Sequence, residues 1–236
     1  MKRTFGWILL SVFAVLACAS PVRIRAWQLS GDTFQERELW AAQNPLDRFE
    51  RVDLDNDGQI ETLQLTAGRV LIRSGDATVW ESPKAWDVRQ VLWSDLNHDG
   101  HQEATLLVWR PFKPWPIDRF IPHGGRIAAF QNEQGLSCHL ILIGLVQGAY
   151  REVWAGSALA EPLQSIAVTD LDADGVQELV ARETSYAQMA PTRGTALSVW
   201  NWNGFGFTLR ARLNSADNRF AIQTAPAHNP TIITGP

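Results

Sequence analysis

Asp170-Leu-Asp-Ala-Asp-Gly-Val-Gln-Glu178 is the stretch that decides the fold of this chain. It places acidic residues at loop positions 1, 3, 5 and 9 and a glycine at position 6. The pattern returns as Asp53-Leu-Asp-Asn-Asp-Gly-Gln-Ile-Glu61 and as Asp95-Leu-Asn-His-Asp-Gly-His-Gln-Glu103. Three copies of one motif indicate a repeat architecture, in which each unit is a small supersecondary element that packs on its neighbours.

Each acidic loop is flanked by short runs of residues that favour strands. The runs are rich in β-branched, aromatic and aliphatic side chains, and no stretch has a 3.6-residue apolar period over a helix length. The sequence therefore predicts an all-β protein. The expected strands cover residues 49–52, 88–93 and 165–168 before the loops, and 62–66, 104–109 and 179–182 after them.

A second hairpin accompanies the acidic hairpins along the chain. The clearest joins residues 195–202 to 205–213 through Asn203-Gly204, a dipeptide typical of two-residue hairpin turns. Other strands of this kind end in Trp40, Trp80 and Trp154. The paired runs are 26–29 with 34–40, 69–73 with 78–80, and 139–144 with 150–154. Two hairpins make a unit of four short strands, as in a propeller blade.

The number of units predicts a small β-propeller-like array of about four blades of four antiparallel strands. Three acidic hairpins, four outer hairpins and a final strand at 219–223 leave half-blades at both ends of the sequence. The end pieces can pair to give a small ring. Otherwise the array stays open and incomplete, or closes by self-association with a second copy, because exposed sheet edges favour pairing.

The acidic loops are predicted to bind Ca²⁺, with up to three sites. Calcium takes six to eight oxygen ligands in irregular geometry, and the glycine at position 6 permits the tight turn. The residue at position 7 would offer its carbonyl, and Asn97 makes the middle loop the weakest site. The alternative is a set of ordinary Asp-Gly turns. The expected ligands are Asp53, Asp55, Asp57, Gln59, Glu61, Asp95, Asn97, Asp99, His101, Glu103, Asp170, Asp172, Asp174, Val176 and Glu178.

An EF-hand is excluded because that loop has its last acidic ligand at position 12, between helices. Position 12 here is Gln64, Leu106 or Ala181. The motif Asp-x-[Asp/Asn]-x-Asp-Gly-x-x-Glu between strands instead resembles the FG-GAP/VCBS repeats of integrin-α-like β-propellers, over residues 27–223. The resemblance implies a calcium-binding propeller whose members include adhesion proteins, lectin-like surface proteins and accessory modules of enzymes. Integrin-type rings have seven blades, so this chain departs from the family in length.

Residues 1–19 are interpreted as a signal peptide, with the propeller-like domain over 20–236. Lys2 and Arg3 precede an apolar run that is shorter than the roughly 20 residues of a membrane span. Two kinds of processing stay open. The sequence before Cys18 resembles a lipobox, which would give a lipid anchor, and Ala17-Cys-Ala19 suits ordinary signal peptidase. The expected location is exported: periplasmic, lipid-anchored at the membrane or secreted.

The cysteine content and the net charge argue against a disulfide-stabilised fold and a nucleic-acid partner. The only cysteines are Cys18 and Cys138, so no disulfide framework is expected, and Cys138 is interpreted as a buried core side chain. The formal charge of −4 gives no reason to expect nucleic acid as a partner.

An insertion at 110–126 is rich in proline and tryptophan. Phe112, Trp115 and Arg119 are candidates to contact a glycan or an anionic group, and the alternative is a loop that packs over the sheet edge. His98 and His101 are interpreted as solvated loop side chains rather than a zinc pair.

Two functions follow from these observations. The first is a binding or scaffold module at the cell envelope, without a catalytic motif, whose partner is an envelope protein or glycan. The second is a polysaccharide-active hydrolase or lyase, which would need an acid/base group outside the loops, such as Asp118, His123 or Glu183.

Overall fold

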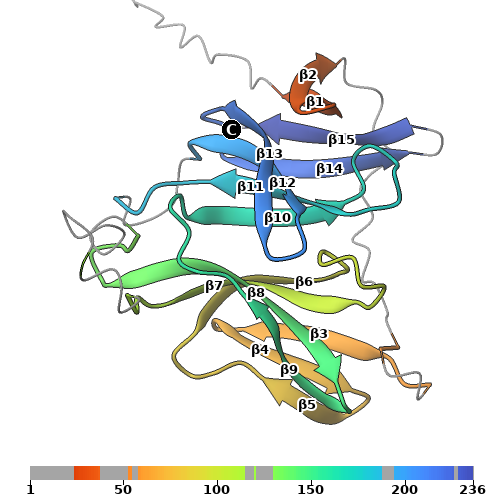
Figure 1. Ribbon diagram of the computed structural model, residues 1–236, viewed down its shortest axis with the longest axis vertical. Helices are drawn as coiled ribbons and strands as arrows, with labels where there is room; N and C mark the ends of the chain where they lie inside the picture. The colour runs from red at the N-terminus through yellow and green to blue at the C-terminus, as the bar shows by residue number, and fades with distance from the viewer. Residues whose placement is uncertain are drawn as a thin grey trace, which may run out of the picture.

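The structure is a computed structural model that describes residues 24–37, 53–54, 58–114, 120, 130–187, 194–225 and 228–235. Within these ranges all the regular elements are antiparallel β-strands, arranged in four separate sheets (Figure 1). The prediction of an all-β, propeller-like array is therefore confirmed. We number the sheets blade I to blade IV in chain order.

Blades II and III are complete four-stranded meanders in which each strand pairs with the next. Their strands agree with the predicted runs to within a few residues. Blade II contains β6 (Asp87–Ser94), β7 (Glu103–Pro111), β8 (Leu136–Val146) and β9 (Ala149–Ala155). Blade III contains β10 (Leu163–Thr169), β11 (Glu178–Glu183), β12 (Ala196–Trp202) and β13 (Phe207–Asn214).

Blade I has three described strands, which correspond to the second, third and fourth strands of a full blade. They are β3 (Glu61–Thr66), β4 (Arg69–Ser74) and β5 (Ala77–Glu81). The strand predicted at 49–52 lies outside the described residues. The register places Leu63 opposite Ile72 and Val70 opposite Leu65, so one face of the sheet is apolar and packs on blade II.

Blade IV is assembled from both ends of the sequence. Its order is β14 (Arg219–Ala225), β15 (His228–Gly235), β1 (Arg25–Ser30) and β2 (Thr33–Arg37). The predicted end pieces therefore do pair, through β15, a strand that sequence reasoning missed. Trp27 Nε1 donates a hydrogen bond to Thr234 Oγ1 (3.0 Å) across this junction.

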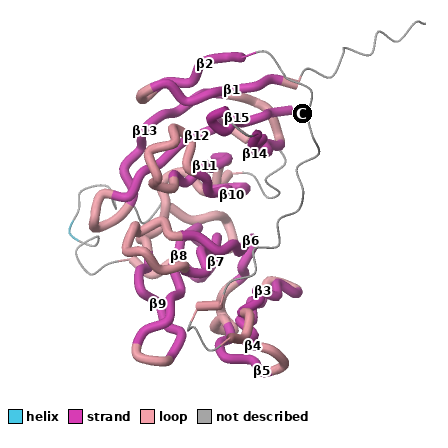
Figure 2. Tube along the Cα trace, turned by 90° about the vertical axis from the view of Figure 1, so that its right-hand side faces the viewer, coloured by secondary structure: helices cyan, strands magenta, loops and turns pink. Residues whose placement is uncertain are grey.

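The four blades stack in the order I, II, III, IV, as Figures 1 and 2 show from two directions. One apolar cluster lies at each junction, and Ile72, Leu140 and Leu197 are central members of the three clusters. Blades I and IV lie at opposite ends of the stack. The described strands therefore form an open array, and the end blades do not meet to close a ring.

A glutamine side chain joins blades II and III at the inner strands. Gln90 on β6 donates from Nε2 to the Ile166 carbonyl (2.6 Å) and accepts from the Ile166 amide at Oε1 (2.9 Å). The side-chain amide thus pairs with β10 as a neighbouring strand would. This contact fixes the two blades relative to each other.

The turn predicted at Asn203-Gly204 is wrong in length. Trp202 pairs with Phe207, so the hairpin has a four-residue connection, residues 203–206. Asn203 Oδ1 accepts from the amides of Phe205 and Gly206, and Asn203 Nδ2 donates to Thr208 Oγ1. The side chain of Asn203 stabilises the longer turn, which the dipeptide alone does not reveal.

Other predictions fall partly inside the described residues. Cys138 is fully buried and free, and burial raises the pKa of its thiol to about 12, which confirms a core role. Arg110, at the start of the predicted insertion, still belongs to β7 and lies over the Trp86 ring. Trp115, Asp118, Arg119, His123 and the segment 1–19 lie outside the described residues. The part of the chain that the structure describes contains no helix able to cross a membrane.

Candidate calcium sites

The three acidic loops lie along the same edge of the stack, on the right in Figure 1. We call them loop 1 (53–61), loop 2 (95–103) and loop 3 (170–178). Each leads into the second strand of its blade, namely β3, β7 or β11. Loops 2 and 3 touch, because Gln177 Oε1 accepts from the Asp95 amide (2.8 Å) and the Gln177 carbonyl contacts His98 Nε2 (3.1 Å).

The same hydrogen bond closes all three loops. The carboxylate at position 1 accepts from the glycine amide at position 6: Gly58 to Asp53 (3.0 Å), Gly100 to Asp95 (3.1 Å) and Gly175 to Asp170 (2.9 Å). The three glycines have φ of 84°, 85° and 90°, a left-handed conformation that other residues rarely adopt. The glycine at position 6 is therefore required by backbone conformation, as the sequence predicted.

The leucine at position 2 anchors the loop in the protein core. Leu96 and Leu171 are fully buried, and Leu54 packs against the cluster between blades I and II. In loops 1 and 3 the amide of this leucine donates to the glutamate at position 9, from Leu54 to Glu61 (2.7 Å) and from Leu171 to Glu178 (2.8 Å). Sequence reasoning missed this residue, although a leucine recurs there in all three copies.

The glutamates at position 9 have buried carboxyl groups. Glu61, Glu103 and Glu178 are 1%, 2% and 0% exposed. Burial, with the charges of Asp99 and Asp95, raises the pKa of Glu103 to about 8, although a hydrogen bond from Asn97 opposes the shift. Burial is also the main cause of the raised pKa of Glu178. Such carboxylates need a cation, a proton or several hydrogen bonds to be stable.

Several buried carboxylate oxygens have no hydrogen-bond partner among the described residues. They are Asp53 Oδ1, Glu61 Oε1, Glu103 Oε2 and Asp172 Oδ1, so every loop contains at least one. Unpaired buried acceptors are rare in folded proteins because each has lost its bonds to water. A hard cation with oxygen ligands would satisfy them, so the residues present fit Ca²⁺.

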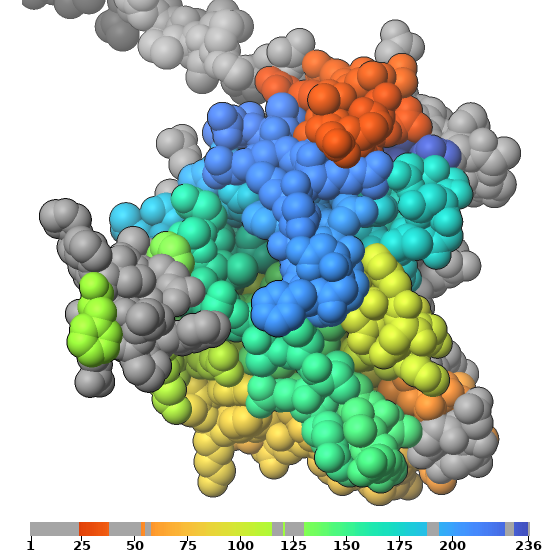
Figure 3. All heavy atoms as spheres, in the orientation of Figure 1, coloured from red at the N-terminus to blue at the C-terminus, as the bar shows by residue number. Residues whose placement is uncertain are grey.

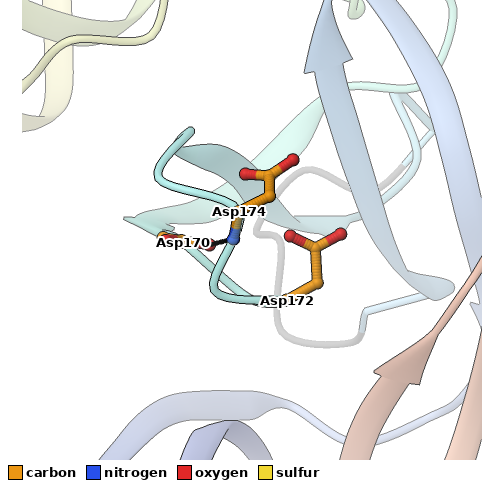
Figure 4. A group of neighbouring side chains, drawn as sticks. All are labelled: Asp170, Asp172 and Asp174. Carbon is orange, nitrogen blue, oxygen red and sulfur yellow. Dashed lines mark hydrogen bonds between the residues drawn. The ribbon is translucent and has the colours of Figure 1, made fainter.

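Loop 3 shows the clearest grouping of ligands. One carboxylate oxygen from each of Asp170, Asp172 and Asp174 lies within 4.8 Å of the others, and Figure 4 shows the three side chains on one loop. Val176 donates its amide to Asp174 Oδ1 (2.8 Å), which orients that carboxylate and leaves the Val176 carbonyl available as a ligand.

An arginine that sequence reasoning missed contacts loop 3. Arg210 on β13 donates from Nη2 to Asp172 Oδ2 (2.6 Å) and from Nη1 to Glu178 Oε1 (3.1 Å). Its Nε reaches Asp32 in the β1–β2 turn of blade IV (3.3 Å). The guanidinium therefore supplies positive charge to two expected ligands. Only its place on the adjacent hairpin, more than thirty residues along the chain, brings it there.

Loop 2 uses an amide where the other loops have a carboxylate. Asn97 Nδ2 donates to Asp99 Oδ2 (3.1 Å) and to Glu103 Oε1 (3.0 Å), so it holds two of the three acidic groups of loop 2 without adding a fourth. His98 and His101 are exposed, as expected of solvated loop residues. In loop 1, Asp53, Gln59 and Glu61 are described, whereas Asp55 and Asp57 lie outside the described residues.

Of the three acid/base candidates, only Glu183 is described. It is buried at the end of β11, and its Oε2 accepts from Arg212 Nε (2.8 Å) and Nη2 (2.7 Å). Neither a protein-family model nor a curated protein matches the chain.

Proposed function

We propose that the chain is an exported calcium-binding repeat protein of the FG-GAP/VCBS type, which acts as a binding or scaffold module at the cell envelope. The observation that supports it is the buried, unpartnered carboxylate oxygen in every acidic loop. Asp53, Asp95 and Asp170 accept the same glycine contact, so the carboxylate at position 1 is held in the same way in the three loops.

Calcium would supply positive charge to the carboxylates of the loops. Asp95, Asp99 and Glu103 in loop 2, and the corresponding residues of loops 1 and 3, would hold the ion. The leucine at position 2 and the glycine at position 6 orient these side chains. Because the loops lead directly into β3, β7 and β11, an ordered loop fixes the start of the second strand in each blade.

The alternative is a polysaccharide-active hydrolase or lyase. Glu183 is its one candidate residue within the described ranges. Its carboxylate accepts two hydrogen bonds from the Arg212 guanidinium, which forms an ion pair with it. An acid/base catalyst has to exchange a proton with substrate, which this pairing opposes. The binding role is therefore the one that we propose.

Calcium removal tests the proposal. At about 1 mM calcium, a site with a dissociation constant of about 0.1 mM gains about 1.4 kcal/mol, from the mass-action relation. For a domain of this size, 1 kcal/mol changes Tm by roughly 2–4 °C, so two or three sites should raise Tm by several degrees. The measurement is thermal unfolding in calcium, in chelator, and in chelator followed by excess calcium.

Terbium provides a second readout of the same sites. Trp93 lies two residues before Asp95 at the end of β6, close enough to transfer excitation to an ion in loop 2. We expect terbium luminescence on excitation of tryptophan, loss of that signal with excess calcium, and a reduced signal in Asp95→Asn. Equal melting curves with and without chelator, together with no displaceable terbium signal, would contradict the proposal.

A further inference from the structure

A cavity separate from the calcium loops lies between the outer parts of blades II and III. Its volume is about 570 Å³, within the usual range of small-molecule sites. Leu140, Leu163 and Leu179, all nearly fully buried, form its floor. Trp154 of β9, Trp200 of β12 and Phe207 of β13 supply aromatic walls. The lining is therefore drawn from both blades and is mostly apolar.

The connection between β12 and β13 covers one side of this cavity. Trp154 Nε1 donates to the Phe205 carbonyl (2.8 Å), so the tip of the blade III hairpin is tied to the outer strand of blade II. Figure 3 shows this hairpin, in blue, lying against the green surface of blade II. Phe205 itself is 88% exposed and lies at the cavity wall. An exposed aromatic side chain beside an apolar cavity favours contact with a ligand over contact with water.

Packing holds the aromatic walls in fixed positions. The rings of Trp154, Trp202 and Phe207 form a triangle of edge-to-face contacts with centroids 5.3–5.4 Å apart. A Cβ on Gly156 would lie 2.8 Å from Trp154 Cη2, so glycine is the residue that leaves room for that indole. The site is therefore largely preformed, which lowers the entropy lost when a ligand binds.

The polar groups of the cavity are few and nearly balanced in charge. The buried carboxylate of Glu183 and the guanidinium of Arg212 neutralise each other. Glu161, which is exposed at the wall, adds one negative charge. An anionic ligand would meet this carboxylate, which has no ion-pair partner among the described residues, and a saccharide would find few hydrogen-bond partners for its hydroxyl groups.

We propose that this cavity binds an uncharged, largely apolar small molecule with an aromatic or fused-ring body. The proposal rests on the proposed binding function, because it names the class of ligand that the module would bind. The cavity shares no residue with the calcium loops, so calcium-dependent melting and occupancy of the cavity can succeed or fail independently.

Titration with N-phenyl-1-naphthylamine, an uncharged fluorescent probe, tests the proposal on the full chain. We expect saturable binding of one probe molecule per chain, with quenching of tryptophan emission. The anionic probe 8-anilinonaphthalene-1-sulfonate should bind more weakly. Ala160→Trp fills the cavity from an exposed position of its wall and should weaken binding by about tenfold or more, because the probe and the indole compete for the same volume.

A matched pair of leucines controls for nonspecific adsorption. Leu209 lines the cavity and is 43% exposed, whereas Leu65 on blade I is 40% exposed and remote from it. Leu209→Ser should weaken binding by about threefold or more, and Leu65→Ser should bind as the wild type does. Non-saturable binding, equal affinities in all variants, or displacement of the probe by cellohexaose or chitohexaose would overturn the proposal. Circular dichroism and Tm confirm that each variant is folded.

Discussion

Arg210 is the residue expected to change most the affinity of loop 3 for the proposed calcium ion. Its guanidinium donates to Asp172 and Glu178, two of the ligands that the sequence predicted for loop 3. A calcium ion that takes both carboxylates has to displace these contacts or share the oxygens with them. Loop 3 has four acidic ligands, but its effective charge is lower than that count implies.

Arg210→Gln should therefore strengthen calcium binding at loop 3 and lower the unfolding free energy of the calcium-free protein. Two buried or half-buried carboxylates lose their cation, which costs about 1–3 kcal/mol of unfolding free energy without metal. Calorimetric titration measures the affinity, and urea unfolding in chelator measures the stability. Arg219→Gln, at an exposed position on β14, is the control. An unchanged affinity would show that Arg210 and calcium do not compete.

His139 predicts a pH dependence of stability that is unrelated to metal. The imidazole is buried, its Nδ1 donates to the Gly156 carbonyl (2.9 Å) and its Nε2 accepts from Ser137 (2.7 Å). Burial lowers the pKa of His139 from 6.5 to about 4. Between these two pH values, His139 is protonated in the unfolded chain and neutral in the folded chain. Its contribution to the unfolding free energy is therefore lost as the pH falls below 6.5.

The measurement is urea unfolding in chelator from pH 4 to pH 7. Relative to His139→Gln, the wild type should lose up to about 3 kcal/mol across this window, because one pKa unit corresponds to about 1.4 kcal/mol. His101→Gln, at an exposed loop position, should keep the wild-type slope. A parallel pH profile for wild type and His139→Gln would mean that His139 titrates normally in the fold.

The residues that sequence could identify are those whose role is local. Asp170, Gly175 and Glu178 lie within nine positions of one another, so their spacing alone encodes the turn and its acidic lining. Arg210 could not be found in this way, because strand pairing within blade III brings it to the loop, and neither could Asp32, because it reaches Arg210 from the neighbouring blade. The same reason explains why the cavity between blades II and III had no signature in the sequence.

At the scale of elements, glutamine side chains form hydrogen bonds with backbone groups of the neighbouring blade. Gln90 pairs with both backbone groups of Ile166, and Gln177 caps the Asp95 amide of the preceding blade. The position equivalent to Gln177 in loop 1 is Ile60, which is 38% exposed. Because no blade precedes blade I in the stack, an amide there would have no loop to cap.

Gln90→Leu should destabilise the protein by about 1–3 kcal/mol, although the substitution keeps the volume of the side chain. Both the amide and the carbonyl of Ile166 lose their partner in a part-buried position, and unsatisfied buried polar groups carry that cost. Chemical denaturation measures the change. Gln64→Leu, on the exposed part of β3, should change the unfolding free energy by less than about 0.5 kcal/mol.

Elements with a strong alternation or turn signal were predicted well, and the exceptions have physical causes. The strand β15 was missed because Asn229 and Pro230 interrupt its start, although its pairing with β14 and β1 is regular from Thr231 onward. The turn after Trp202 was predicted too short, because Asn203 uses its side chain to hold a wider loop.

For the molecule as a whole, the sequence predicted the number of blades but left open whether they close. Each junction depends on apolar faces that look alike in sequence, so local patterns do not show which blades end the stack. The described strands of blade I end it with a mainly polar face: Thr62 lies opposite Arg73 and Thr66 opposite Arg69, with Leu71 opposite Gln64 between them, on the side away from Ile72. A polar end face is typical of the capping unit of a repeat array and does not favour pairing with a second copy.

Blade IV contains strands from both ends of the sequence, so we expect that a truncated chain and a separate C-terminal peptide can assemble it. A chain that stops after Asp217 lacks β14 and β15 and should expose the apolar face of blade III that contains Leu197 and Val199. We expect it to melt several degrees lower and to be cut rapidly by protease. A synthetic peptide of residues 218–236 should restore both properties.

The peptide carrying Ile232→Asp is the control for this complementation. Ile232 is fully buried between β1 and blade III, so a carboxylate there should abolish rescue. Rescue by both peptides would mean that the added segment acts outside blade IV, and rescue by neither would mean that the truncated chain has lost more than one blade.

The pairing of Trp27 with Ile232 also sets the order of events during synthesis. The described strands of blades I to III are neighbours along the chain, so their hairpins can form as the polypeptide emerges. One edge of β1 stays unpaired until β15 is available, and a contact between residues about two hundred positions apart is expected to form slowly because of its loop-closure entropy.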